Sequence, residues 1–187
     1  MNFKFMLETK EIYTYSSTSN IREFELIISD LINNETVQKM KNFRQHYETS
    51  CFEHCKMVAY YCYVICKKYD LDYVSATRAA MLHDLFLYDW RFREDGRKGL
   101  HAFTHPKTAL ENASKLFKLN EKEKDIILKH MWPVTIRLPK YKESYVITLV
   151  DKYCALQESI KSYKSKKKFQ IAYRYAYVFL SMLVILR

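Results

Sequence analysis

Apolar residues recur along most of this chain with the period of an amphipathic helix. In the first part of the chain this pattern predicts helices over residues 21–33, 35–43 and 50–68. The third is the clearest, because one stripe of its surface is wholly apolar at the spacing i, i+3, i+4, i+7: Cys55, Val58, Ala59, Cys62, Ile65 and Cys66. Asp72 then has the side chain of an N-cap and predicts a fourth helix that runs to about Leu87.

The helical pattern is interrupted at residues 89–104. This segment contains both glycines of the chain and many charged side chains, so it is predicted to be a loop. The next helix is expected to begin at Thr104 or His105. Pro106 would then lie in its first turn, where a missing backbone N–H does no harm.

The rest of the pattern and the composition indicate the same fold class. Residues 120–130 predict a short helix that opens with a capping box formed by Asn120 and Glu123, and residues 142–160 predict a longer one. The chain has only two glycines and three prolines, fewer turn residues than an all-β domain needs. An all-α fold is therefore predicted, with residues 1–187 in a single domain.

The net charge is +10, and much of the excess lies in a basic segment near the C-terminus, residues 161–187. Such a charge favours anionic partners, although a solvated lysine-rich surface is the simpler interpretation. A phosphorylated small molecule is the expected partner, rather than nucleic acid or a membrane. Residues 175–186 are almost wholly apolar but shorter than the roughly twenty residues of a membrane span. They predict a core helix or a helix that joins two copies in a homodimer, with association at a membrane surface as the alternative.

Five cysteines are present, and four of them form two i, i+4 pairs: Cys51 with Cys55, and Cys62 with Cys66. Zinc sites use short Cys-x2-Cys turns more often than continuous helix, so buried reduced thiols are favoured over a cysteine metal site. The N-terminal residues have no sustained apolar run and predict no secretory signal. Reduced thiols and the absence of such a signal together predict a cytoplasmic protein.

Six residues carry most of the chemical information, and each lies in or at the start of a predicted helix, on or beside an apolar face: His54, His83, Asp84, His105, His130 and Asp151. A single such histidine is more often a hydrogen-bonded core residue than a ligand. As a set, however, they arrive from separate helices, which is how a helical bundle builds a metal centre. Imidazole and carboxylate together suit Mn, Fe, Ni or Zn. His46 and His101 lie outside the set and are interpreted as surface or supporting residues.

The order His, then His-Asp, then His, His and a distant Asp resembles the HD superfamily of metal-dependent phosphohydrolases, in its two-metal form. The resemblance covers about residues 46–158 and implies a helical bundle of the HD-domain type. It also implies that His54, His83, Asp84 and Asp151 hold one divalent metal. His105 and His130 would hold the second, with Asp84 bridging the two and acting as the catalytic carboxylate.

One segment departs from that family. Many two-metal members follow His-Asp with Ile-Gly-Lys, where the lysine can face phosphate, whereas this chain has Leu85-Phe86-Leu87. The candidates to bind phosphate in its place are Arg91, Arg93, Arg97 and Lys152, with ordinary surface charge as the alternative for each. The missing lysine weakens any transfer of a cyclic-dinucleotide substrate.

The resemblance implies a phosphohydrolase that acts on a nucleotide or another small phosphate ester through a metal-bridged hydroxide. Two alternatives remain open at the level of sequence. Some HD-fold proteins with the same ligand order resemble di-iron oxygenases, which activate O₂ instead of water. HD-like domains can also act as binding modules without catalysis, although such modules tend to lose ligands and all six positions are filled here.

Overall fold

The computed structural model describes residues 18–46, 49–92 and 99–166, and these residues form an all-α bundle with one small sheet. The helices, in chain order, are α3 (Thr18–Ile32), α4 (Glu35–Gln38), the 3-10 helix η1 (Lys39–Asn42), α5 (Cys51–Lys68), α6 (Tyr73–Leu82), α7 (His101–Leu116), α8 (Glu121–Lys129) and α9 (Lys142–Lys166). Two short antiparallel strands, β1 (Arg44–His46) and β2 (Thr49–Ser50), precede α5. The predicted fold class is confirmed.

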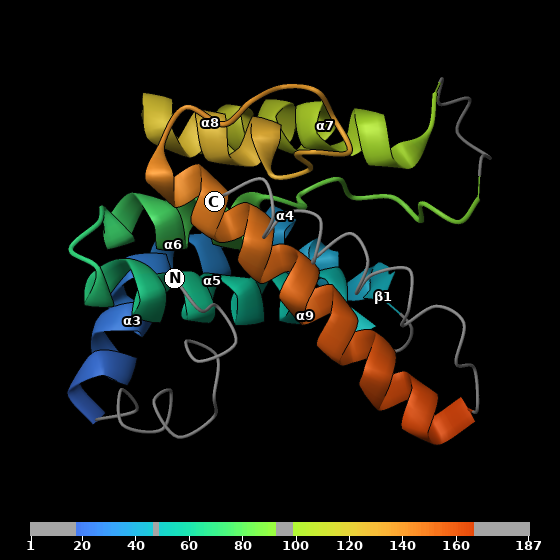
Figure 1. Ribbon diagram of the computed structural model, residues 1–187, viewed down its shortest axis with the longest axis horizontal. Helices are drawn as coiled ribbons and strands as arrows, with labels where there is room; N and C mark the ends of the chain where they lie inside the picture. Colours follow the sequence, from blue (N-terminus) through green and yellow to red (C-terminus); the bar gives the residue numbers. More distant parts are fainter. Residues whose placement is uncertain (1–17, 47–48, 93–98, 167–187) are drawn as a thin grey trace.

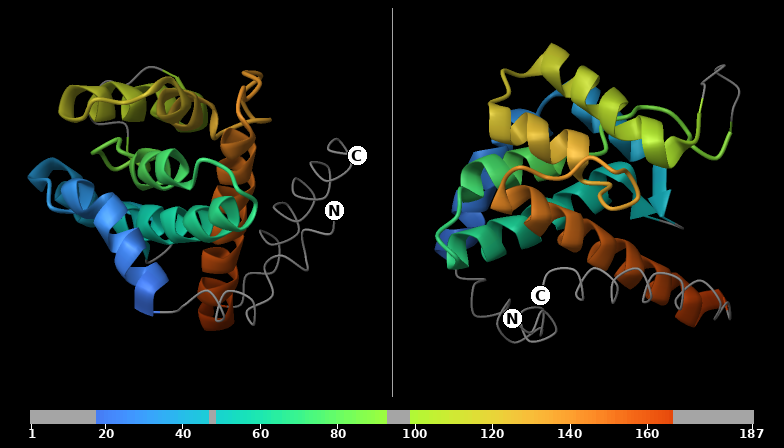
Figure 2. Two further views of the ribbon diagram at one scale, coloured as in Figure 1. Left: turned by 90° about the vertical axis from the view of Figure 1, so that its left-hand side faces the viewer. Right: turned by 45° about the horizontal axis from the view of Figure 1, so that its top comes forward.

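The helices are stacked in layers that α9 crosses (Figure 1). Helix α5 packs against α6 and α9, α6 packs against α3 and α8, and α8 packs against α7 and α9. Figure 2 shows α5, α6 and the α7–α8 pair lying one above another, with α9 running across them. Because α9 touches α5, α6 and α8, residues on one of its faces can meet side chains from several layers.

Polar side chains fix where the helices begin. Ser50 accepts a hydrogen bond from the backbone N–H of Glu53 at 3.2 Å, and the Glu53 carboxylate accepts one from the backbone N–H of Ser50, which makes a capping box at the start of α5. Asp72 caps α6 by accepting from the N–H of Ser75. The predicted capping box at Asn120 is present at the start of α8. The starts of α6 and α8 thus confirm the sequence prediction.

The first two corrections concern the ends of helices near the candidate ligands. Helix α6 ends at Leu82 and not near Leu87, since His83 is its C-cap and Leu87 has a φ of 35°. Helix α7 begins at His101 rather than at Thr104 or His105, so the predicted loop is shorter and Pro106 lies in the second turn. The earlier end of α6 makes His83 its C-cap, next to carbonyl groups that have no partner within the helix. The earlier start of α7 places His105 inside that helix rather than at its beginning.

Other boundaries also differ from the prediction. Residues 35–43 contain a short helix and a 3-10 turn instead of one helix, and the strands that follow were not predicted. Helix α9 extends to Lys166, beyond the predicted end at residue 160. The basic C-terminal segment lies largely outside the described residues, as does the whole of the apolar run at residues 175–186, so their predicted roles remain predictions.

The core is formed mainly by α5 and α6 and is closed by residues of the other helices. All five cysteines are free and buried, which confirms the expected thiols. Burial raises the pKa of each of these thiols, which keeps them protonated. No helix in the described part of the chain is both long and apolar enough to cross a bilayer.

Candidate metal centre

The six residues singled out in the sequence come together at the centre of the bundle. His54 lies on α5, His83 and Asp84 follow the last turn of α6, His105 lies on α7, His130 caps α8, and Asp151 lies on α9. All six are buried, with exposed fractions between 0% and 8%. The four histidines and Asp84 form two clusters that share Asp84, and Asp151 lies beside the first of them.

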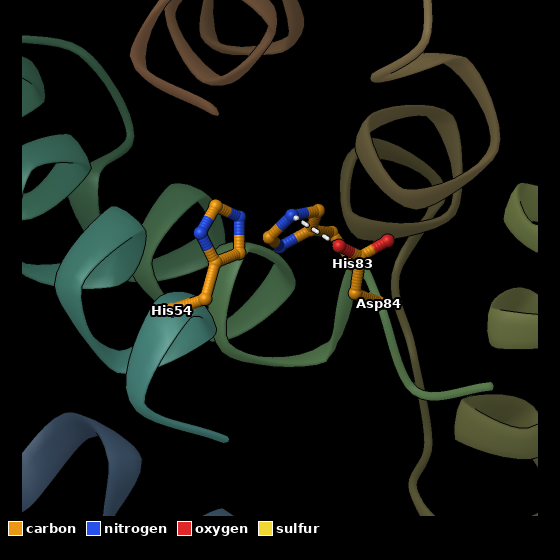
Figure 3. A group of neighbouring side chains, drawn as sticks. All are labelled: His54, His83 and Asp84. Carbon is orange, nitrogen blue, oxygen red and sulfur yellow. Dashed lines mark ion pairs between the residues drawn. The ribbon is translucent and has the colours of Figure 1, made fainter. Parts of the chain in front are cut away.

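The first cluster contains His54, His83 and Asp84, whose side chains point toward one another in Figure 3. The Nε2 atom of His83 lies 3.3 Å from an Asp84 carboxylate oxygen, Oδ2. Asp151 closes the cluster from α9, because its Oδ1 atom lies 3.1 Å from Nε2 of His54 and 3.6 Å from Nε2 of His83. Two imidazole nitrogens and two carboxylates thus converge on one small volume.

The second cluster contains Asp84, His105 and His130. The other carboxylate oxygen of Asp84, Oδ1, lies 3.2 Å from Nε2 of His105 and 3.6 Å from Nε2 of His130. The two Nε2 atoms are 2.8 Å apart. Asp84 therefore presents one oxygen to each cluster, which is the arrangement that a bridging carboxylate requires.

Backbone carbonyls orient three of the four imidazoles. His83 and His130 are the C-caps of α6 and α8, and the Nδ1 atom of each lies 2.7 or 2.8 Å from the carbonyl oxygen three residues earlier. Carbonyl groups in the last turn of a helix have no partner within the helix, so they are free to accept these bonds. The Nδ1 atom of His105 lies 2.8 Å from the carbonyl oxygen of His101. In each case the Nδ1–H donates and Nε2 is left to face the centre.

The donor set fits a divalent metal. His83 Nε2 and Asp84 Oδ1 are buried and make no hydrogen bond of acceptable geometry, although Asp84 Oδ2 lies 3.3 Å from the first and Nε2 of His105 lies 3.2 Å from the second. Buried polar atoms without such a bond are costly, and coordination to a cation would satisfy both. Imidazole nitrogen with carboxylate oxygen is the ligand chemistry of Mn, Fe, Ni and Zn.

Protons balance the charges of these carboxylates in the metal-free protein. Burial lowers the pKa of His54, but its hydrogen bonds to Asp151 and Glu158 outweigh burial and raise the pKa to about 10. Burial also opposes protonation of His83, whose pKa is nevertheless raised, chiefly by the charge of Asp84. His130 has a pKa lowered to about 3 by burial and by the positive charges of neighbouring histidines. A metal ion would take over the role that protons have at His54 and His83.

Two buried side chains near the centre were not found from the sequence. The amide nitrogen of Gln45, on β1, donates a hydrogen bond to Asp84 Oδ2, and Glu158 on α9 lies 3.0 Å from Nδ1 of His54. The position of Glu158 could have been predicted from its spacing, because it follows Asp151 by seven residues and so lies on the same helical face two turns later. The position of Gln45 could not have been predicted in this way, because it lies on one of two short strands that the hydrophobic pattern did not predict.

The predicted phosphate-binding residues lie in different places. The ammonium of Lys152 donates hydrogen bonds to the carbonyl oxygens of His130 and Thr148, at 3.1 and 3.3 Å, and lies 4.0 Å from Asp151 Oδ2. Arg91 is exposed, and its guanidinium is bound by Asp89. The other two predicted residues lie outside the described part of the chain: Arg93 and Arg97. Lys152 is thus the predicted phosphate ligand that the described residues place beside the centre.

One of the two histidines outside the set, His101, lies against a ligand candidate. His101 stacks on the ligand candidate His105, with ring centroids 4.4 Å apart, and on Trp90 at 5.5 Å. The predicted supporting role of His101 is therefore consistent with its position, while the side chain of His46 lies outside the description. Leu85 and Phe86 are buried, and Leu87, which stands where the Ile-Gly-Lys segment would have its lysine, is half-buried and packs against the core.

A surface groove of about 650 Å³ lies between α7 and the segment that follows α8. Phe103, Leu128 and Ile136 form apolar parts of its lining. None of the six clustered residues lines this groove. The groove is therefore separate from the two clusters.

The part of the chain that matches a known protein family includes the whole centre. A family model described as HD domain matches residues 51–156, more than half of the chain. Comparisons with curated proteins and with solved structures gave no match. The matched range begins at the first residue of α5 and ends within α9, so it includes all six clustered residues. Gln45 and Glu158 lie just outside it.

The two clusters predict different effects of two substitutions. Asp84→Ala should lower metal occupancy of both clusters, because one carboxylate contributes an oxygen to each. His130→Ala should empty chiefly the second cluster. Elemental analysis after loading with Mn or Fe measures both, and wild-type protein should retain about two ions per chain if Asp84 bridges. Equal loss of a single ion in both variants would contradict a shared Asp84.

Metal uptake should release protons. At pH 7 His54 is protonated in the metal-free protein, since its pKa is raised to about 10, and a metal requires its neutral form. Affinity should therefore fall as the pH falls. Calorimetric titration with Zn in two buffers of different ionisation enthalpy measures the protons released. Identical heats in the two buffers would contradict the prediction.

Proposed function

Because the chain belongs to the HD domain family, we propose that it is a metal-dependent phosphohydrolase acting on a nucleotide or another small phosphate ester. The observation that supports this proposal most directly is the position of Asp84 between two clusters, with one oxygen directed at each. Two adjacent cations match a phosphate group, which carries negative charge on several oxygens.

The proposed ligands divide between the clusters. His54, His83 and Asp151 would hold one metal, His105 and His130 would hold the other, and Asp84 would bridge them. When bound, such metals lower the pKa of a water molecule and neutralise charge that develops on the phosphate. The carbonyl contacts of His83, His105 and His130 support this division, because they leave Nε2 of each imidazole directed at its cluster.

Lys152 is the proposed phosphate anchor on the protein side. Its ammonium has three N–H groups, two of which meet the carbonyl oxygens of His130 and Thr148. The ammonium also lies 4.0 Å from Asp151 Oδ2, and the proposed role of its third N–H is to donate to a phosphate oxygen at the edge of the centre. Burial lowers the pKa of Lys152, opposed by the charges of Asp151 and Asp84. A largely buried ammonium beside an anion forms a stronger hydrogen bond than an exposed one does.

The proposed reaction is a hydrolysis in which water attacks phosphorus. A bond forms between the water oxygen and phosphorus, the ester P–O bond breaks, and the departing alcohol oxygen ends with a proton from the water. No oxidant is consumed. This balance separates the proposal from the oxygenase alternative, which would use O₂.

The test is a screen of purified protein, loaded with Mn, Fe, Ni or Zn, against a panel of nucleotides and small phosphate esters. Release of inorganic phosphate or of a nucleoside monophosphate, lost in Asp84→Ala, is the expected result. Asp84→Ala is the control for contaminating phosphatases. Metal-dependent oxygen consumption without phosphate release would favour the oxygenase. Bound metal with neither activity would favour a binding module.

A second test concerns Lys152. Lys152→Met keeps the length of the side chain but removes its charge, and should lower kcat/KM for a phosphate ester about 10- to 100-fold, the effect of losing a hydrogen bond to a charged group. Lys67→Met is the matched control, because Lys67 is a partly buried lysine on α5 that binds Glu23. Equal kcat/KM in both variants and in wild type would argue against a phosphate contact. Circular dichroism establishes that each variant is folded.

A further inference from the structure

His54 differs from the other three histidines of the centre in what meets its Nδ1 atom. His83, His105 and His130 each direct Nδ1 at a backbone carbonyl. The Nδ1 atom of His54 instead lies 3.0 Å from a carboxylate oxygen of Glu158. Its other nitrogen, Nε2, faces Asp151 in the first cluster. The reason is local, because His54 lies in the first turn of α5, where the backbone has unpaired N–H groups rather than unpaired carbonyls.

Glu158 is held in a position that is costly for a carboxylate. It is 6% exposed, and its second oxygen, Oε2, is buried without a hydrogen-bond partner. Its ion-pair contact with His54 joins α9 to α5 across 104 residues of sequence. A buried carboxylate is destabilising unless a partner compensates for its lost hydration. The imidazole of His54 is that partner.

We propose that Glu158 is the positioning residue for His54. Its carboxylate accepts the Nδ1–H, which fixes the tautomer in which Nε2 carries the lone pair that faces the first cluster. A carboxylate is a stronger acceptor than a carbonyl, so it also makes the imidazole a better donor to a cation. The inference rests on the proposed metal centre and adds to it a residue outside the range that the family model matches.

Charge balance gives Glu158 a second effect. Two divalent cations carry four positive charges, and Asp84 and Asp151 supply two negative ones. Glu158 supplies a third negative charge. Its carboxylate contacts His54 rather than the metal position, so it does not occupy a coordination position. Because low dielectric strengthens interactions between buried charges, this carboxylate should favour retention of the cation at the His54 cluster over the one at His105 and His130.

The experiment compares metal affinity in Glu158→Ala and Glu158→Gln with wild type. Zn affinity is measured by competition with a chromophoric chelator. In Glu158→Ala, the affinity of one of the two sites for Zn should be about 10- to 100-fold lower than in wild type. Glu158→Gln should lie between, since an amide oxygen can still accept the Nδ1–H but carries no charge. The matched control is Glu143→Gln, because Glu143 lies on the same helix, is 5% exposed and binds Lys122.

A spectroscopic measurement separates positioning from general damage to the fold. In Zn-loaded wild type, long-range ¹H–¹⁵N correlation should show the His54 proton on Nδ1, in slow exchange with water. Glu158→Ala should lose that slow exchange while the signals of His105 and His130 keep theirs. Zn affinity within twofold of wild type in Glu158→Ala, or an unchanged Nδ1–H signal, would overturn the proposal.

The proposed hydrolysis and the proposed role of Glu158 can fail independently, and the experiments distinguish the two failures. A protein that binds two metals and hydrolyses nothing contradicts the proposed reaction, and the affinity comparison still decides the role of Glu158. A wild-type protein that takes up no metal overturns both the centre and the positioning role. Loss of affinity in Glu143→Gln as large as in Glu158→Ala would also overturn it, because any buried charge on α9 would then have the same effect.

Discussion

The burial of Asp84 is the constraint on which this arrangement depends. The carboxylate is 1% exposed and lies deep in an apolar bundle, where a lone negative charge would be strongly destabilising. Positive or hydrogen-bonding groups from three sides compensate for it: His83 from the adjoining residue, His105 from α7 and Gln45 from β1. The backbone of Asp84 is also held, since the Cys51 thiol donates to its carbonyl at 3.1 Å. The helices must meet where they do for this charge to be tolerated.

The ends of α6 and α8 show how local structure and chemistry are linked. If α6 continued to Leu87, the carbonyl of Ala80 would accept the N–H of Asp84 in the ordinary helical pattern. Because the helix ends at Leu82, that carbonyl accepts from the side chain of His83 instead. The same substitution of a side-chain donor for a backbone donor occurs at His130. A helix end is therefore a simple way to orient an imidazole.

Much of the fold could be predicted because helical periodicity and capping residues are local signals. The stripe on α5, the cap at Asp72 and the capping box at Asn120 all appear in the structure. The end of α6 could not be predicted from periodicity, because Leu85 and Phe86 are apolar and buried and thus continue the pattern past the last helical turn. The six clustered residues were found because of their chemical type. Gln45 was missed because an amide in a short strand has no periodic or chemical signal of its own.

The contacts of α9 have a consequence for how the protein folds. His54 meets Asp151 and Glu158 across 97 and 104 residues of sequence, while Asp84, His105 and His130 lie within a much shorter stretch. Closing a longer loop costs more chain entropy than closing a shorter one. The second cluster contains no residue of α9, whereas Asp151 lies beside the first only because α9 packs against α5. During synthesis on the ribosome, the last helix to emerge among the described elements is the one that completes the His54 cluster.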